Sequence, residues 1–341
     1  MAVGRGESGR SVRDGYPRGV TRPHVPQEVL DLAHARRDAR AARDWKRADA
    51  LRAEIEVAGW TVVDRGVDFD LARAHPPDLE AGGIVRYGSS ASVPSRLGEP
   101  ATAPATVIAI ATDEPDDTTR LVRGLAPSMA AGLQVVVVAD GPSADDDELL
   151  GTLGSAGIEI VRTSARLGQA ATINAGARRA IGAVMVLLDA SVEPTGDVIG
   201  PLGRALDDPT VAVAGPWGLR STDLRHFDDA PGPDADAIAG SCVAFRRADF
   251  ADRGPIDEKF QFYRNLDIWW SLVLRDEGED RPPRRALVVP NLPIVRHEHR
   301  GWTSVAPDER DRLSKRNFYR VLDRFGGRLD LVSAAGKPAR S

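Results

Sequence analysis

Apolar and polar positions alternate along the chain in blocks that change character near residue 105. From there on, strand-sized apolar runs alternate with segments whose apolar residues recur at helical spacing. The apolar runs are residues 105–112, 133–141, 158–163 and 183–188. The helical segments are residues 116–131, 145–153 and 168–181. This β-α-β-α-β-α-β order predicts a doubly wound, mainly parallel α/β sheet.

The region before residue 105 has a different pattern. Residues 1–25 are rich in Gly, Arg and Ser and are expected to be disordered. Residues 26–75 contain two amphipathic helical stripes, followed by two alternating runs on either side of Arg65-Gly66. The apolar positions of the stripes are Val29, Leu32, Ala33, Trp45, Ala48, Leu51 and Ile55. We therefore expect a helical hairpin plus a β-hairpin, and a linker in the proline- and serine-rich residues 76–104.

The composition excludes several classes of protein. The chain has 341 residues with a formal net charge of −5, which gives no electrostatic case for binding nucleic acid over its whole surface. Its single cysteine, Cys242, excludes an internal disulfide and any metal site built from several cysteines. No apolar segment follows the basic residues of the N-terminus, so no secretory signal is expected. We predict a cytoplasmic protein.

The first candidate for chemistry lies at the end of the fourth predicted strand. The run AVMVLLDASVEP, residues 183–194, carries Asp189 directly after the apolar residues. The carboxyl ends of parallel strands are where open α/β sheets place ligands. A carboxylate there can also cap the next turn, so the run alone does not decide between the two roles.

Six segments of residues 105–330 together resemble family 2 glycosyltransferases. They occur in the family's order: IAIATDEPD, VVVVADGPSADD, RLGQAATINAGARRA, LLDASVEP, AGSCVAFRRADFADRGPIDEKF and FYRNLDIWWSLVLRDEG. The resemblance implies a GT-A fold that binds a nucleotide-diphosphate sugar and a divalent metal, with residues 331–341 as a tail.

The resemblance implies a nucleotide pocket near the first two strands. Asp140 takes the position that contacts the base in the family, which favours a UDP- or dTDP-sugar; an Asp-Gly turn explains the same residue structurally. Thr112 and Glu114 are expected to line the base and ribose pocket. Arg166 is the candidate for a phosphate contact.

The resemblance also implies a site for Mn²⁺ or Mg²⁺. Asp189 is the leading ligand, but the second Asp of the family's D-x-D motif is Ser191 here, and Glu193 is a candidate replacement. His297 and His299 follow the acceptor-side segment and could complete the site, with Arg296 and Arg300 beside the diphosphate. A polar loop with hydrogen-bonded imidazoles is the alternative reading.

The catalytic base is the second departure from the family pattern. The family's Glu-Asp pair is Arg264-Asn265 here, and neither residue is a base at neutral pH. Asp267 is the nearest carboxylate and is the candidate base, with a structural role as the alternative. Asp257 and Glu258 are further carboxylates for which a capping role is expected. The acceptor-side candidates are Gly240, Ser241 and one of the adjacent tryptophans, Trp269.

Residues 27–72 resemble the C-terminal tail of cysteinyl-tRNA synthetases. The run ARRDARAARDWKRADALRAEIEVAGWTVVDRGVDF carries the resemblance, which implies a contact with RNA. Residues 26–56 contain seven basic and seven acidic residues, so no net attraction for phosphate is expected.

The sequence thus favours a glycosyltransferase that inverts the anomeric carbon with the help of a metal. The alternatives are a catalytically degenerate protein that binds nucleotide sugars, and an adaptor that contacts RNA through its N-terminal module. A peripheral contact with a membrane is not favoured. The pattern does not identify the sugar or the acceptor.

Overall fold

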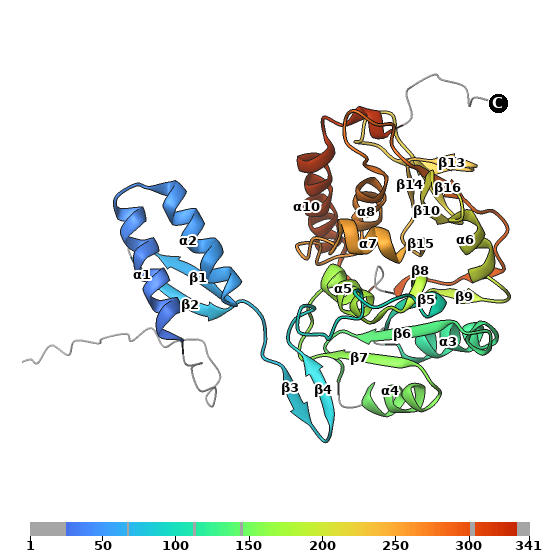
Figure 1. Cartoon of the computed structure of the whole chain (residues 1–341), viewed down its shortest axis with the longest axis horizontal. Coiled ribbons are helices and arrows are strands. Elements are labelled where there is room, and N and C mark those ends of the chain that lie inside the picture. Colours follow the sequence, from blue (N-terminus) through green and yellow to red (C-terminus); the bar gives the residue numbers. More distant parts are fainter. Residues whose placement is uncertain (1–24, 67, 112–113, 144–145, 301–303, 333–341) are drawn as a thin grey trace, which may run out of the picture. The chain divides into compact units, whose positions relative to one another are not determined.

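The computed structural model describes residues 25–66, 68–111, 114–143, 146–300 and 304–332. The chain divides into two compact units, residues 1–75 and 76–341 (Figure 1). Within the described ranges, no helix is both long enough and apolar enough to cross a membrane.

The first unit is the predicted helical hairpin and β-hairpin. It consists of α1 (Gln27–Ala41), α2 (Trp45–Val57), β1 (Trp60–Arg65) and β2 (Asp68–Arg73), and the two strands pair antiparallel. The Asp44 side chain caps α2 by accepting a hydrogen bond from the Arg47 N–H at 3.0 Å. A small core forms around Val29, Ala33, Ile55, Trp60 and Val62.

Trp45 departs from the predicted apolar stripe. It is the first residue of α2, and 58% of its surface is exposed. A side chain in the first turn points back beyond the helix end, away from the face that packs further along the helix. Ala48, Leu51 and Ile55, further along the same stripe, are buried as predicted.

The second unit is built on a ten-stranded sheet in the order β13-β16-β10-β15-β8-β5-β6-β7-β4-β3. Its parallel centre consists of β5 (Ala103–Ala111), β6 (Gln134–Ala139), β7 (Glu159–Thr163) and β8 (Gly182–Leu188). The helices between these strands are α3 (Pro115–Ala130), α4 (Asp146–Ser155) and α5 (Gln169–Arg179). The predicted doubly wound, mainly parallel sheet is confirmed.

The later strands extend the sheet with mixed directions. β15 (Cys242–Arg246) pairs antiparallel with β8, and β10 (Val211–Gly215) pairs antiparallel with β15. β16 (Arg285–Val288) and β13 (Asp234–Ala235) complete that edge. A separate small sheet is formed by β11 (Gly218–Arg220), β12 (Asp228–Ala230) and β14 (Ala237–Ile238).

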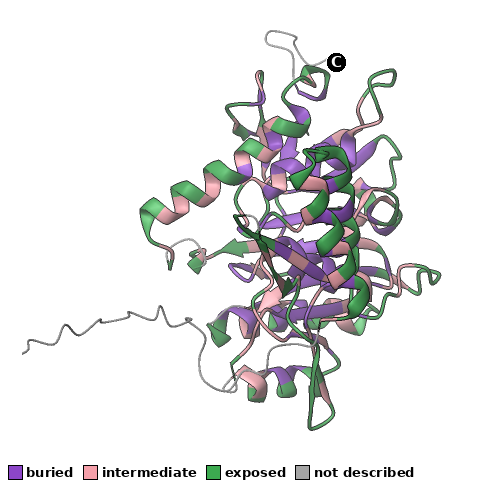
Figure 2. Cartoon of the chain, turned by 90° about the vertical axis from the view of Figure 1, so that its left-hand side faces the viewer, coloured by how far each residue is buried: buried purple, intermediate pink, exposed green. Residues whose placement is uncertain are grey.

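Alternate residues of the central strands enter two separate cores, one on each face of the sheet. In β6, Val136 and Val138 pack on one face, and Val135 and Val137 on the other. One face is covered by α5, α7 (Arg247–Arg253), α8 (Leu266–Arg275) and α10 (Pro307–Phe325); the other is covered by α3, α4 and α6 (Ile199–Ala205) (Figure 1). Figure 2 shows the sheet between these layers as the most buried part of the unit.

Gly176 allows α5 to approach the sheet closely. A Cβ at this position would lie 2.6 Å from Ile108 Cγ2 and 2.9 Å from Val138 Cγ2. We expect Gly176→Ala to lower the free energy of unfolding by about 1–3 kcal/mol, because the core has to shift to accept the methyl group. Chemical denaturation measures this change.

Gly151→Ala in α4 is the matched control, because a Cβ there meets no atom within 4 Å. Its higher helix propensity predicts a gain of about 0.5–1 kcal/mol. Equal stability changes in the two variants would contradict the close approach of α5.

The segment predicted to be a linker contributes to the sheet. Within residues 76–104, β3 (Leu79–Ala81) and β4 (Ile84–Tyr87) form a hairpin, and β4 pairs parallel with β7. Val93 is fully buried, and the carbonyl oxygens of Arg96 and Glu99 accept hydrogen bonds from Arg247. The prolines and glycines of this stretch lie between short ordered segments. Composition alone cannot distinguish such segments from a linker.

A two-stranded clasp brings the histidine segment to the end of β8. β9 (Val192–Pro194) follows β8 directly, and β17 (Ile294–Arg296) pairs with it antiparallel, with Val295 opposite Glu193. The chain then continues into His297 and His299. A short 3₁₀ turn, Leu329–Leu331, ends the described part of the chain.

Candidate functional site

A cavity of about 1690 Å³ opens where the parallel strands end. This is larger than the roughly 300–1,000 Å³ typical of a pocket for one small molecule, so it can hold two substrates. Nine of the predicted site residues line it: Glu114, Asp140, Arg166, Asp189, Ser191, Gly240, Ser241, Asp267 and His299. The sheet therefore gathers most of the predicted chemistry in one place. Thr112 lies outside the described residues.

Asp189 is held at the end of β8 by contacts from three segments. Its N–H donates to the Ser241 carbonyl at 2.9 Å, which continues the pairing of β8 with β15. Its Oδ1 accepts hydrogen bonds from the Ser191 N–H and hydroxyl. Its Oδ2 lies 3.3 Å from His299 Nε2.

The electrostatics of this pair favour the charged forms of both groups. Burial by itself would raise the pKa of Asp189, but the hydrogen bond and charge of His299, with the bonds from Ser191, lower it below its ordinary value. Burial opposes protonation of His299, yet the hydrogen bond and charge of Asp189 raise the pKa of its imidazole. Tyr263 stacks on the His299 ring with 4.2 Å between centroids and fixes its plane.

His297 points away from this pair. Its Nε2 lies 2.7 Å from Glu193 Oε2, and neither residue is among those that line the cavity. His297 and Glu193, both predicted near the metal, thus pair with each other across the β9–β17 clasp. His299, two residues further on, reaches the cavity.

Asp140 lies at the tip of β6 and organises the turn before α5. Its Oδ1 accepts a hydrogen bond from the Leu167 N–H at 2.7 Å, and its Oδ2 accepts one from the Gly168 N–H at 3.0 Å. Oδ1 also accepts a hydrogen bond from the Thr163 hydroxyl at 3.1 Å, so Oδ2 is the oxygen that retains acceptor capacity. The turn that Asp140 holds also carries Arg166 to the cavity wall.

Arg296 and Arg300, which were predicted to lie beside the diphosphate, both line the cavity, and each contacts a different residue. Arg300 Nη1 lies 2.7 Å from Glu114 Oε2, so this nucleotide candidate is ion-paired. The guanidinium of Arg296 lies 4.9 Å from the ring centroid of Trp217, which comes from the loop before β11.

Asp267 occupies the floor of the cavity at the start of α8. Its Oδ2 accepts a hydrogen bond from the Gly240 N–H at 2.8 Å, and its Oδ1 accepts one from the Ile268 N–H at 2.9 Å. Burial raises the pKa of this carboxyl above its ordinary value, against the lowering effect of the two backbone bonds. A raised pKa makes the ionised group a stronger base.

The positions of the family's Glu-Asp pair have a structural role here. Asn265 adopts a left-handed conformation with φ 65° directly before α8, and its side chain donates to the Ser314 carbonyl of α10 at 3.0 Å. Asn317 of α10 donates to the Phe262 and Arg264 carbonyls. α10 therefore fixes the loop that precedes Asp267.

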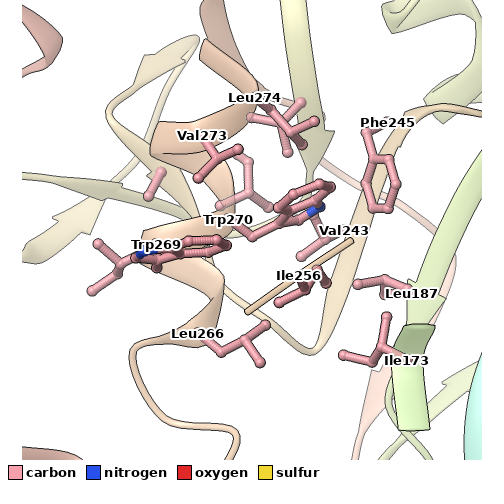
Figure 3. Packing of buried hydrophobic residues seen from close by; sticks show 14 of the residues in the cluster. Ile173, Leu187, Val243, Phe245, Ile256, Leu266, Trp269, Trp270, Val273 and Leu274 are labelled. Carbon is pink, nitrogen blue, oxygen red and sulfur yellow. The ribbon is translucent and has the colours of Figure 1, made fainter. Parts of the chain in front are cut away.

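The two adjacent tryptophans differ in where they lie relative to the cavity. Trp269 is buried against Phe260, with 5.3 Å between ring centroids, and does not line the cavity. Trp270 borders the cavity from within the core, where it packs on Phe245 (Figure 3). Gly240 and Ser241, the other two acceptor-side candidates, do line the cavity, whereas Trp269 does not.

Asp257 caps the adjacent turn, whereas Glu258 contacts residues that are distant along the chain. Asp257 Oδ1 accepts a hydrogen bond from the Lys259 N–H, and Glu258 Oε1 accepts bonds from Asn174 and Ser90. Sequence reasoning missed Tyr263, Trp217 and Asn317. No periodicity or motif in the sequence marks these residues, because each acts through a partner distant along the chain.

The described residues contain no group of three or more His, Cys, Asp or Glu side chains that could hold a metal by themselves. Asp189, His299 and the Ser191 hydroxyl are thus a partial donor set. Such a set fits a divalent cation whose remaining positions are filled by phosphate oxygens and water.

The fold is of the GT-A class. Residues 106–263, a little under half of the chain, match the family model of glycosyl transferase family 2. The predicted fold and family resemblance are confirmed.

The crystal structure of GalNAc-T7 with UDP, GalNAc and Mn²⁺ is similar over 64% of this chain, with a TM-score of 0.52 and 17% identity. Two further similar structures are the mannosyltransferase PcManGT from Pyrobaculum calidifontis with GDP-Man and Mn²⁺, and residues 1–349 of S. aureus TarS. The mannosyltransferase is 16% identical, with 73% of this chain and 81% of that chain covered and a TM-score of 0.45. TarS is 12% identical, with 65% and 72% covered and a TM-score of 0.44.

The N-terminal region is similar to a different protein. It is 48% identical over 50 residues to the cysteine–tRNA ligase of Opitutus terrae. The chain spans 48% of the GalNAc-T7 chain and 11% of the ligase.

Proposed function

We propose that this protein transfers a sugar from a nucleotide-diphosphate sugar to an acceptor hydroxyl, with inversion at the anomeric carbon. The observation that carries the proposal is the Asp189–His299 pair, which faces the large cavity at the end of β8. Asp189 lies inside the residues that match the family 2 model, and His299 reaches the cavity from beyond them. In open α/β sheets this edge is where ligands bind.

The donor is proposed to lie along the ends of β5, β6 and β8. Asp140 accepts the imide N–H of a uracil or thymine ring, and Arg166 contacts phosphate. Arg296 and Arg300, from the segment after β17, contact the diphosphate. UDP, which the GalNAc-T7 structure contains, is the donor nucleotide we propose to test first.

Asp189 and His299 are proposed to hold Mn²⁺ or Mg²⁺, with the Ser191 hydroxyl beside them. The cation, when bound, neutralises charge on the departing nucleoside diphosphate. Tyr263 keeps the imidazole plane of His299 in place, and the β9–β17 clasp delivers the segment that carries it.

Asp267 is proposed to act as the base. The acceptor oxygen attacks the anomeric carbon and gives its proton to the Asp267 carboxylate, while the bond from that carbon to the diphosphate oxygen breaks. The backbone bonds from Gly240 and Ile268 orient the carboxylate at the cavity floor. Gly240 and Ser241, on the loop between β14 and β15, border the acceptor.

Calorimetry with UDP and Mn²⁺ on a matched pair of histidine variants tests the metal part of the proposal. We expect His299→Gln to weaken Mn²⁺ binding in the presence of UDP by about 10–100-fold, because one of two charged or imidazole ligands is lost. His297→Gln, in the same segment but turned toward Glu193, is expected to change it less than about threefold.

Equal losses in the two variants would contradict the assignment of His299. The donor is then identified by hydrolysis assays on a panel of UDP-, dTDP- and GDP-sugars. Unchanged UDP binding with and without Mn²⁺ would remove the metal from the proposal and leave the nucleotide site standing.

A second candidate function is a protein that binds nucleotide sugars without transferring them. It is favoured by Arg264 and Asn265, which replace the family's acidic pair and are tied to α10. Tight UDP binding with no hydrolysis or transfer for any donor would establish this candidate. RNA contact by the N-terminal unit and a cytoplasmic location stay predictions.

A further inference from the structure

A second hollow lies on the opposite side of α10 from the large cavity. This hollow, the α10 groove, has a volume of about 660 Å³ and lies between α10 and residues 255–259. Phe318 lines the large cavity, whereas its neighbour Tyr319 lines the α10 groove. Adjacent residues on a helix point to different faces, so the helix separates the two spaces.

Four cations surround the α10 groove. Three of them, Arg316, Arg320 and Arg324, are spaced four residues apart along α10. They therefore lie on the same side of the helix, with a rise of about 6 Å along its axis between successive Cα atoms. Lys259 adds a fourth positive charge from the facing loop. The protein as a whole has a formal net charge of −5, so this local concentration of positive charge is opposite in sign to the net charge.

None of these four side chains has a carboxylate within 4.0 Å among the residues that the structure describes. Two acidic residues, Asp257 and Asp323, also line the groove. Asp257 is engaged with the Lys259 backbone N–H at 3.0 Å. The groove therefore keeps an excess of positive charge. Its arginines differ in this respect from the arginines that form ion pairs elsewhere in the protein.

Two of the guanidinium groups are held in place by aromatic rings. Arg324 lies 5.1 Å from the ring centroid of Trp269, and Arg320 lies 5.9 Å from that of Phe260. Arg320 Nη1 also donates a hydrogen bond to the Arg316 carbonyl at 3.1 Å. A guanidinium has five N–H groups, so each of these side chains keeps donors for an anion. These cations are thus oriented without being neutralised.

We propose that the α10 groove binds a small molecule that carries a phosphate or diphosphate group. Guanidinium groups recognise phosphate oxygens in a bidentate manner. The volume of the groove, about 660 Å³, leaves room for a small molecule. Tyr319, 63% exposed at its edge, offers a face for the organic part of the ligand.

Calorimetric titration of the full chain with inorganic pyrophosphate tests the proposal. We expect Arg316→Gln/Arg320→Gln to weaken pyrophosphate binding at least about tenfold relative to the wild type. Arg316→Lys/Arg320→Lys, which keeps the charge, is expected to recover part of the loss. Lys315→Gln removes an exposed charge next to Arg316 but outside the groove, and is expected to change the affinity less than about twofold.

The outcome does not depend on the transferase proposal. If pyrophosphate binds only in the large cavity, the Gln pair and Lys315→Gln bind it as the wild type does, and the proposal is overturned. It is overturned equally if vesicles of anionic phospholipid bind through these arginines while pyrophosphate and UDP do not. Thermal unfolding of each variant separates a lost site from a lost fold.

Discussion

Asp189→Asn is expected to lower sugar transfer, or donor hydrolysis where the acceptor is unknown, by at least about 100-fold. Asn preserves the shape of the side chain and its bonds with Ser191, but it removes the negative charge that faces His299 and the cavity. A 100-fold loss corresponds to about 3 kcal/mol of transition-state stabilisation, a reasonable share for one charged metal ligand. Turnover of a saturating donor as a function of Mn²⁺ concentration measures it.

Asp207→Asn is the matched control for this change. Asp207 is exposed and does not line the large cavity, so its loss is expected to leave turnover within about twofold. Turnover by Asp189→Asn at the level of this control would show that the end of β8 has only a structural role.

Asp267→Asn is expected to lower kcat by about 10²–10⁴-fold with little change in the donor KM. This is the range associated with removing a positioned base, and donor binding rests on other residues. The amide retains the size of the side chain, so its oxygen can still accept a hydrogen bond from the Gly240 N–H. Steady-state kinetics with varied donor concentration separates the two parameters.

The pH profile provides an independent check on Asp267. The proposed base, Asp267, can accept a proton only when ionised, and burial raises its pKa above the ordinary value. Activity is therefore expected to fall as the pH decreases through that raised pKa, at a higher pH than an exposed aspartate would give. Asp267→Asn loses this acidic limb. Wild-type turnover in the variant, with the limb retained, would assign the base to another group.

The sequence predicted the fold well because the information is local. Buried parallel strands are read as continuous apolar runs, and β5 to β8 all lie where these runs predict them. Trp45 and the β3–β4 hairpin differ from the prediction because their surroundings are not local in the sequence. Whether an aromatic residue at a helix end is covered, or a proline-rich segment joins a sheet edge, depends on neighbours that the local pattern does not contain.

The candidate site was predictable where the residues sit at strand ends, and not elsewhere. Asp140 and Asp189 follow apolar runs, so their common edge can be deduced. Which of His297 and His299 reaches the cavity cannot be deduced from the sequence, because it depends on how β17 pairs with β9. The same holds for Trp269 and Trp270, whose faces are decided by the packing of α8 against α10 and β10.

The clasp between β9 and β17 has a consequence for how the protein matures. About a hundred residues separate the two strands, and the four parallel strands β5 to β8 all precede β9 in the chain. A polypeptide synthesised only as far as β9 therefore contains Asp189 but not His299, and so only half of the proposed cation-binding pair. The pair can form only after translation has passed β17.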